Sequence, residues 1–447
     1  MTAEVEGTAA RKAAGNGFWS RHILAVIFAV LVIVHWIGVY SVTGDQYIFA
    51  INTFAVSVAA TYVIAAFFLR GVFDRLTDLI SQAGVATQQA RGFLLALDLL
   101  VILFPVFYFW AAGYVPIVKM YFTTDFMVAS EIRYNFFASL PSWQRYAGEY
   151  YIKGLVPLWL IFSYITKRRL FLLTFLAATV FSFAIVTKAY ILIVFAPLLI
   201  VLISQKRWIS SGLMFLFIAV LMMLSVIVQH KSSLLPKPPE AELPPATELS
   251  DMPSLRSAEV PKALRVSDAD GKTLLVSFLW KPIEAIWLRA FSAIGVIEGQ
   301  WLETYPSEAP FEGGCGYSWA SKIADCKFVN LANKIWKKYY PDLEARGLNG
   351  TVTAADYVQA YANFGMIGIV ASGAVIGIII VLLGIAFPDP AIRVALNTLP
   401  LALTFESVLT TLLNSSGWGI TIALGALLFA SCPSAQDSGT PVAKASR

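Results

Sequence analysis

Lys188 is the one charged residue in a long apolar stretch, FAIVTKAYILIVFAPLLI, which covers residues 183–200. A lysine in such a run has two explanations. Its apolar stem can lie in lipid while the ammonium group reaches the headgroups, or the ammonium group can bind a specific partner. An anionic substrate such as a lipid pyrophosphate is a partner of that kind. Lys188 is therefore a candidate catalytic cation.

The polar segment 114–150 mixes aromatic side chains with acids and with two arginines, Arg133 and Arg145. Tyrosine and tryptophan rings stack on sugars, and arginine makes bidentate contacts to phosphate. Arg133 and Arg145 are therefore candidate substrate contacts. The alternative is that this segment only supplies the aromatic side chains usual at a membrane interface.

A second polar segment, residues 230–360, begins with a stretch rich in Pro and charge, residues 230–271, that we expect not to form a packed core. From Leu274 onward, apolar residues recur at helical spacing, which predicts a partly helical region over 274–360. Arg289 is its candidate catalytic cation, unless it only pairs with Glu284 on a helix surface.

The same segment offers side chains for proton transfer and for sugar binding. A carboxylate within hydrogen-bond reach of a reacting hydroxyl can act as a general base. The candidates are Glu312, Asp356 and Glu298, and the sequence does not choose among them. Candidate substrate contacts in this part of the chain are Tyr305, Asn349 and Tyr361.

Two of the three cysteines, Cys315 and Cys326, fall in this segment, and no cysteine spacing resembles a metal site. If the segment lies in an oxidising periplasm, a local disulfide between them is expected. Cys432, at the end of the last apolar run, should remain a thiol.

Motifs for other chemistry are missing from the sequence. It contains no Walker loop, no dinucleotide-binding fingerprint and no HExxH, and its three histidines are far apart in sequence. We therefore expect no cofactor and no metal. The formal charge of +5 is too small to indicate a nucleic-acid partner.

The elements that must position these residues are membrane helices. Hydrophobic residues make up 58% of the 447 residues and charged residues only 14%, which is typical of an all-α polytopic membrane protein. Ten apolar runs of suitable length are expected to span the bilayer: 22–41, 48–69, 93–113, 151–166, 170–186, 189–205, 208–229, 365–387, 393–413 and 418–431.

Lys and Arg lie at every second connection between these runs, which predicts that both termini are cytoplasmic. The tails are 1–21 and 432–447, helices 1–7 occupy 22–229 with an outer loop at 114–150, and helices 8–10 occupy 361–431 after a large periplasmic loop at 230–360. Residues 167–207 then form a tight hairpin with Lys188 at its outer mouth.

A family resemblance follows from these features. A basic residue between two short spans, here in VTKAY, precedes a large outer loop with Arg289, a PFEGGCG turn and a closing YANFGMIG at 361–368. This arrangement resembles the Wzy-type O-antigen and exopolysaccharide polymerases, which are akin to the O-antigen ligases. The resemblance covers about residues 110–370. The histidine that ligases carry before the closing pattern is absent, which favours a polymerase.

The resemblance implies a membrane glycosyltransferase (GT-C-like) fold in the bacterial inner membrane. It implies an enzyme that joins oligosaccharide repeats carried on undecaprenyl pyrophosphate at the periplasmic face, with no nucleotide or metal. A chain-length regulator and a flippase would be its protein partners. Lys188 and Arg289 would hold the departing pyrophosphate while a base helps the acceptor hydroxyl to attack.

Two other functions stay open. A transferase that uses a polyprenyl-phosphate monosugar would carry a catalytic acid in the first outer loop, where Asp45 lies. A flippase or other transporter of lipid-linked glycan would instead depend on ionisable groups inside its spans, which are Asp98 and Glu406 here.

Overall fold

The computed structural model describes residues 18–68, 70–123, 132, 135–137, 139–234, 293–345 and 350–429, and this part of the chain is all-α, without a strand. Arg133, Arg289, Asn349, Cys432, both tails and nearly all of the segment rich in Pro and charge lie outside the described residues.

Within the described residues, five helices are long and apolar enough to cross a membrane. They are α2 (Phe18–Thr43), α3 (Ile48–Phe68), α5 (Arg91–Ala112), α12 (Trp208–Leu234) and α19 (Met366–Ala386). Large apolar side chains on them face outward: Phe68 is 79% exposed, Trp110 80% and Ile367 79%. Such surfaces need a lipid environment rather than water. The chain is therefore an all-α membrane protein.

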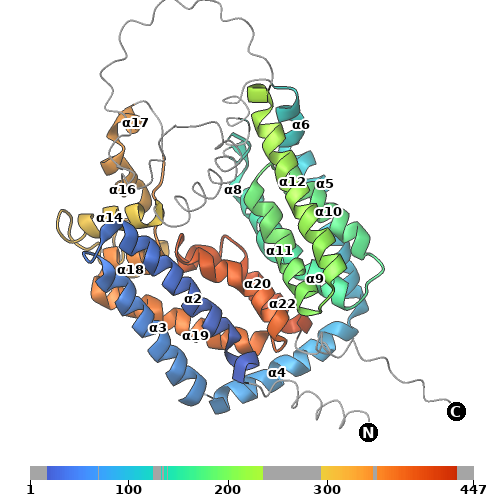
Figure 1. Cartoon of the computed structure of the whole chain (residues 1–447), viewed down its shortest axis with the longest axis horizontal. Coiled ribbons are helices and arrows are strands. Elements are labelled where there is room, and N and C mark those ends of the chain that lie inside the picture. Colours follow the sequence, from blue (N-terminus) through green and yellow to red (C-terminus); the bar gives the residue numbers. More distant parts are fainter. Residues whose placement is uncertain are drawn as a thin grey trace, which may run out of the picture.

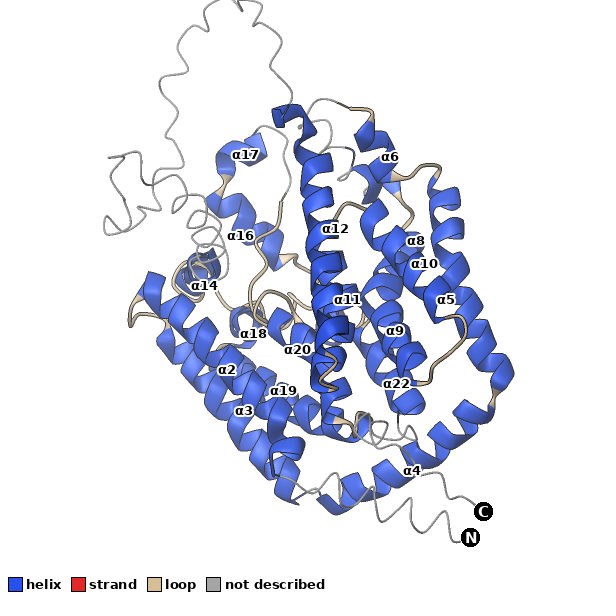
Figure 2. Ribbon diagram, turned by 45° about the vertical axis from the view of Figure 1, so that its right-hand side comes forward, coloured by secondary structure: helices blue, strands red, loops and turns tan. Residues whose placement is uncertain are grey.

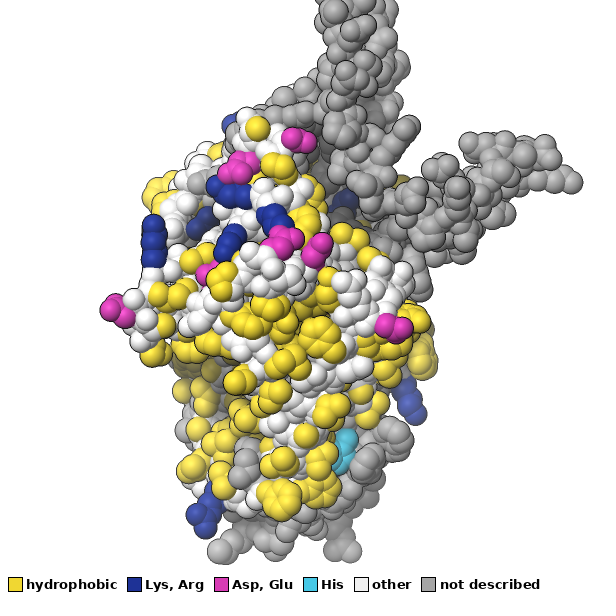
Figure 3. Space-filling model, turned by 90° about the vertical axis from the view of Figure 1, so that its left-hand side faces the viewer, with side chains coloured by type: hydrophobic (Ala, Val, Ile, Leu, Met, Phe, Trp, Pro, Cys, Tyr) yellow, Lys and Arg dark blue, Asp and Glu magenta, His cyan; other side chains and the backbone are white. Residues whose placement is uncertain are grey.

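The distribution of charge over one face agrees with this conclusion. Figure 3 shows Lys, Arg, Asp and Glu side chains gathered in its upper part, above a broad region of apolar side chains, with few charges further down. The upper part is formed by short helices: α14 (Ala293–Thr304), α15 (Ser318–Ile323), α16 (Leu331–Tyr339), α17 (Pro341–Ala345) and α18 (Asp356–Phe364).

The helices below form two groups with α20 (Pro390–Leu403) between them, and α18 packs on the first of these groups (Figure 1). One group holds α2, α3, α18 and α19. The other holds α5, α12 and six shorter elements: α6 (Pro116–Tyr121), α8 (Ser142–Glu149), η1 (Tyr150–Leu155), α9 (Val156–Ile165), α10 (Phe171–Ala184) and α11 (Lys188–Ser204). Helix α20 packs against α2 on one side and α11 on the other. It is followed by α21 (Leu409–Leu413) and α22 (Trp418–Phe429).

Each of the ten predicted spans overlaps at least one described helix, but four of the apolar helices are only 10–17 residues long. Helix α10, with 14 residues, rises only about 21 Å, against a hydrocarbon core of about 30 Å. The number of crossings therefore stays a prediction, as does the GT-C-like fold.

Three features differ from the sequence expectations. The predicted span 393–413 is wrong as one helix, because α20 ends at Leu403 and a turn precedes α21. The connection after α3, for which the sequence predicts no element, is a 20-residue amphipathic helix, α4 (Arg70–Gln89), which crosses the base of the bundle from α3 to α5 (Figure 2). The predicted span 151–166 begins with the π-helix η1 rather than with regular α-helix.

Orientation in the membrane can be tested by reporter fusions. The α9–α10 and α11–α12 turns place Lys167 and Lys206 at positive φ, in tight connections at the same end of neighbouring helices. We expect fusions after Lys167 and Lys206 to report cytoplasm, and fusions after Ser233 and Gly350 to report periplasm. A cytoplasmic signal at Gly350 would put α14–α18 on the wrong side for the function proposed below.

Candidate functional site

Lys188 begins α11 directly after the tight turn at the mouth of the α10–α11 hairpin. Val186 has φ 59° and Thr187 is extended, so the chain reverses within a few residues. The Lys188 side chain is half-buried and makes no hydrogen bond or ion pair with the described residues. The structure thus places Lys188 at the predicted hairpin mouth, and its role in catalysis stays a prediction.

A cavity opens on the other side of α11. Its walls come from η1 and α9, from α11, from α20, and from the segment around α21 and α22. The lining is mainly apolar: Pro157, Ile193, Pro197, Ala395, Leu396, Leu399, Pro400, Leu403, Leu412 and Trp418, with the polar residues Lys153, Ser416 and Thr421. Pro197 follows Lys188 by nine residues, or about two and a half helical turns. Lys188 therefore lies on nearly the opposite face of α11 from this cavity.

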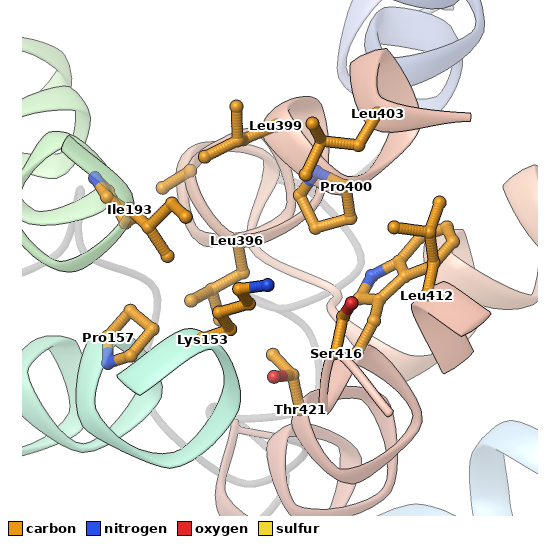
Figure 4. Close-up of a pocket in the computed structure, with 13 residues that line it drawn as sticks. Lys153, Pro157, Ile193, Leu396, Leu399, Pro400, Leu403, Leu412, Ser416 and Thr421 are labelled. Atoms are coloured by element: carbon orange, nitrogen blue, oxygen red, sulfur yellow. The ribbon is translucent and has the colours of Figure 1, made fainter. Parts of the chain in front are cut away.

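Lys153 is the one charged residue that lines the cavity. Figure 4 shows its side chain extending from η1 into the space between Leu396 and Ser416. Its Nζ atom lies 2.5 Å from Glu149 Oε2. The Tyr190 hydroxyl donates a 2.5 Å hydrogen bond to Glu149 Oε1. An ion pair and a hydrogen bond thus join a lysine, a carboxylate and a phenol from η1, α8 and α11, and the lysine lines the cavity.

Sequence reasoning missed Lys153. The available signal was its spacing: Glu149 and Lys153 are four residues apart, so they meet on one face of a helix. Lys153 also lies near the start of the predicted apolar span 151–166, where an ionisable side chain is a candidate functional group.

In the outer part of the molecule, the two segments that carry the family resemblance pack together. The Glu312 amide donates to the Ala362 carbonyl at 3.0 Å, and the Gly313 amide donates to the Asn363 carbonyl at 2.9 Å. The Gly316 amide donates to Asn363 Oδ1 at 2.8 Å. The PFEGGCG turn is therefore held directly on the first half of YANFGMIG.

Glycines make this contact possible. A Cβ atom on Gly316 would lie 2.4 Å from Leu331 Cδ1, and one on Gly368 would lie 2.1 Å from the Ala360 carbonyl oxygen. Gly365 has φ 63°, a region that favours glycine, and it packs against Phe311. A Cβ atom on Gly316 would also lie 2.7 Å from the Asn363 side chain, so Gly316 and Gly365 are the glycines at which the two segments pack closely together.

Glu312 lies in the first of these segments with two partners. The Tyr305 hydroxyl donates to Glu312 Oε1 at 3.0 Å, and Lys334 Nζ lies 2.6 Å from the same oxygen. Burial and the nearby Glu312 carboxylate raise the pKa of the Tyr305 phenol, so this group stays a donor at neutral pH. The second oxygen, Oε2, accepts no hydrogen bond from the described residues. Glu312 therefore keeps an acceptor that an acceptor-sugar hydroxyl can use.

The lysines of α16 are all paired. Besides the Lys334–Glu312 contact, Lys337 Nζ lies 2.6 Å from Glu344 Oε1, and Lys338 contacts the Glu308 carboxylate. This basic helix is consequently neutralised by its neighbours and is a poor site for a further anion.

A disulfide joins Cys315 and Cys326, the pair that the sequence predicts, with an S–S distance of 1.99 Å. It closes the loop that contains α15. The Val329 amide donates to the Cys315 carbonyl at 2.9 Å, so the same loop is also tied to the residues that precede α16. The disulfide thus fixes the turn that carries Glu312.

Asp356 is buried at the start of α18, where both of its carboxylate oxygens have partners. The Leu409 amide donates to Oδ1 at 2.7 Å, and the Ser372 hydroxyl donates to Oδ2 at 2.6 Å. Asp356 therefore fixes the turn between α20 and α21, whose neighbours Leu403 and Leu412 line the cavity. This arrangement favours a structural role over that of a base.

Glu298 is buried as well. Its carboxylate lies 2.9 Å from His35 Nε2 and accepts a 2.6 Å hydrogen bond from the Tyr357 hydroxyl. The His35 ring packs on Phe405 with ring centroids 4.3 Å apart. These contacts join α14 to α2 and to the α20–α21 turn. Of the three candidate bases, only Glu312 has an accessible oxygen.

Asp98 and Glu406 do not form an intramembrane pair. Asp98 is 1% exposed and contacts the Arg168 guanidinium group, and the Trp159 indole donates to its Oδ1 at 2.9 Å. Glu406 is exposed in the turn after α20, where the predicted span 393–413 is broken. The burial of the Asp98 carboxylate is thus explained by its ion pair with Arg168, which lies in the turn between α9 and α10.

The other predicted contacts are spread over the molecule. The Arg145 guanidinium group lies 5.7 Å from the centre of the Tyr146 ring on α8. The Tyr361 ring packs against Phe311 and Phe49, with centroids 5.2 Å and 6.0 Å away. Asp45 is exposed in the α2–α3 turn. Arg133, Arg289 and Asn349 are not among the described residues, so their positions relative to Glu312 stay predictions.

In comparisons with protein-family models, with curated proteins and with solved structures, none matched this chain. Fold and site together define an all-α membrane protein with a disulfide-stabilised outer part and a polar cluster at an internal cavity.

Proposed function

We propose that this protein is a polymerase that joins oligosaccharide repeats carried on undecaprenyl pyrophosphate at the periplasmic face of the bacterial inner membrane. The observation that carries this proposal is the contact between the PFEGGCG turn and the YANFGMIG segment. These segments bear the resemblance to Wzy-type polymerases, and together they hold Glu312 with one free carboxylate oxygen.

The reaction needs a base, a leaving-group site and two glycan positions. The acceptor hydroxyl oxygen attacks the anomeric carbon of the donor, and its proton passes to Glu312 Oε2. The bond between the anomeric carbon and the pyrophosphate oxygen breaks, and undecaprenyl pyrophosphate leaves with both electrons of that bond. Cations that stabilise this anion lower the barrier. Lys188 and Arg289 are the proposed cations, and Arg133, Arg145, Tyr305, Asn349 and Tyr361 are proposed substrate contacts.

The proposal can be tested first in cells. A strain that lacks the gene should display surface glycan capped with a single repeat, and the wild-type gene should restore long chains on a gel. Asp45→Asn should restore them too, because Asp45 has no place in this mechanism. Loss of long chains with Asp45→Asn would favour the transferase that uses a polyprenyl-phosphate monosugar.

Lys188 is tested by its own series of variants. If it stabilises the leaving pyrophosphate, Lys188→Ala should lower polymerisation about a hundredfold, as expected for one lost charge-assisted contact in a transition state. Lys188→Arg should keep much of the activity because it keeps the charge. Polysaccharide gels, normalised to the amount of inserted protein, measure the effect. Full-length glycan from Lys188→Leu would instead assign Lys188 to the lipid edge, in keeping with its face of α11.

A further inference from the structure

Two of the helices that form the cavity contain a proline where they line it. Pro197 lies inside α11 and Pro400 inside α20, and both line the cavity. Proline has no N–H group, so the carbonyl four residues earlier loses its usual helical donor. Those carbonyls belong to Ile193 and Leu396, which also line the cavity. Residues four apart share a helix face, so each proline and the residue whose carbonyl it leaves without a donor lie on the same side of the helix, next to the cavity.

A third interruption lies opposite. The π-helix η1 carries Lys153, and Pro157 follows in the first turn of α9. π-Helical turns are rare and occur frequently at functional sites. Freed backbone groups at membrane depth are tolerated where they line a polar cavity. The elements α11, α20 and η1 thus bring irregular backbone to one space. Lys153 adds an ammonium group to this space, and Ser416, from the connection between α21 and α22, adds a hydroxyl group.

The depth of this space suits a membrane lipid. Lys153 precedes the end of α9 at Ile165 by twelve residues, which is about 18 Å of helix in a hydrocarbon core of about 30 Å. Leucine and proline side chains form most of the wall. A ligand that fits this space therefore has three parts. An anionic group pairs with Lys153, hydroxyl groups donate to the backbone carbonyls, and an apolar chain packs on the leucine and proline side chains.

We infer that this cavity binds the phosphate-bearing end of a polyprenyl-linked sugar, with Lys153 exchanging Glu149 for the phosphate. Tyr190 holds the other oxygen of Glu149, so the carboxylate stays in place when Lys153 turns to the ligand. The sugar hydroxyls next to the phosphate donate to the freed carbonyls of Ile193 and Leu396. This inference rests on the proposed function for the identity of the lipid, but the site can be tested without polymerisation.

The exchange predicts opposite effects for the two members of the ion pair. Lys153→Met should weaken binding of undecaprenyl phosphate tenfold or more, because a charge-assisted contact is lost. Glu149→Gln should tighten binding, because the intramolecular competitor for Lys153 loses its charge. A purely structural ion pair would give no such opposition, since either change would only loosen the fold.

Native mass spectrometry of the full chain in detergent, titrated with undecaprenyl phosphate, measures these affinities. Lys153→Arg keeps the charge and should keep binding within a few fold, while Lys119→Met, an exposed lysine on α6, is the matched control and should not change it. Inorganic pyrophosphate is the second probe, and its binding should be far weaker because it lacks the apolar chain.

Unchanged lipid binding by Lys153→Met would overturn the inference, as would weaker binding by Glu149→Gln or equal binding of inorganic pyrophosphate. The proposed function fails separately: a protein that binds undecaprenyl phosphate through Lys153 but never lengthens glycan keeps the cavity assignment and loses the polymerase assignment. If Lys153→Met binds the lipid normally and still polymerises glycan, the cavity assignment is lost and the polymerase assignment is kept.

Discussion

Glu312→Gln is expected to lower the rate of polymerisation a hundredfold or more while leaving the protein folded and inserted. Proton transfer by a positioned side chain contributes about 10²- to 10⁴-fold to a rate. Glutamine keeps the shape of the side chain and can still accept hydrogen bonds from Tyr305 and Lys334, but it cannot take the proton of the acceptor hydroxyl. Chain growth in membranes from the variant strain, normalised to protein amount, measures the loss.

Lys334→Met is the matched control for this change. It removes the same ion pair but leaves the carboxylate, and the pair is partly exposed, so its loss costs about 1 kcal/mol or less. We expect Lys334→Met to keep most of the activity. Equal losses in Glu312→Gln and Lys334→Met would mean that Glu312 only fastens its turn to α16, and the base would have to be sought elsewhere.

Arg168→Met is expected to destabilise the fold by about 3 kcal/mol, because it leaves the Asp98 carboxylate buried without its countercharge. Asp98 is 1% exposed, and its remaining partner is the Trp159 indole. Reversible unfolding in mixed micelles measures the difference. Arg169→Met, one residue further along the chain and exposed, should change the free energy of unfolding by about 0.5 kcal/mol or less.

The double variant Asp98→Asn with Arg168→Met separates the two parts of this effect. Without either charge, the cost of an unpaired buried ion disappears, so the double variant should be more stable than Arg168→Met alone. If Arg168→Met and Arg169→Met were equally stable, Asp98 would not depend on Arg168, and a role of Asp98 in transport would regain support.

The helices were predictable from sequence because long apolar runs leave few alternatives in a membrane. The limits of α3, α5 and α19 lie within a few residues of the predicted runs, and the Cys315–Cys326 pair follows from local spacing. The break in 393–413 was not predictable from hydropathy, since the turn after Leu403 depends on Asp356, which is distant in sequence, and on the packing of His35 on Phe405.

The candidate site was predictable only where its residues are close in sequence or stand out by charge. Lys188 stands out in an apolar run, and its place at a hairpin mouth follows from two short helices. Its orientation away from the cavity depends on which face of α11 meets α20, and that is decided by tertiary packing. The choice of Glu312 over Glu298 likewise needs the partners of each carboxylate, which lie on other helices.

The most direct measurement of the central claim uses purified protein in liposomes that contain undecaprenyl-pyrophosphate-linked repeats, with no nucleotide sugar added. The account predicts a ladder of glycans that grows by whole repeats, with one undecaprenyl pyrophosphate released for each linkage formed. Repeats that remain single in liposomes with correctly inserted protein would contradict it.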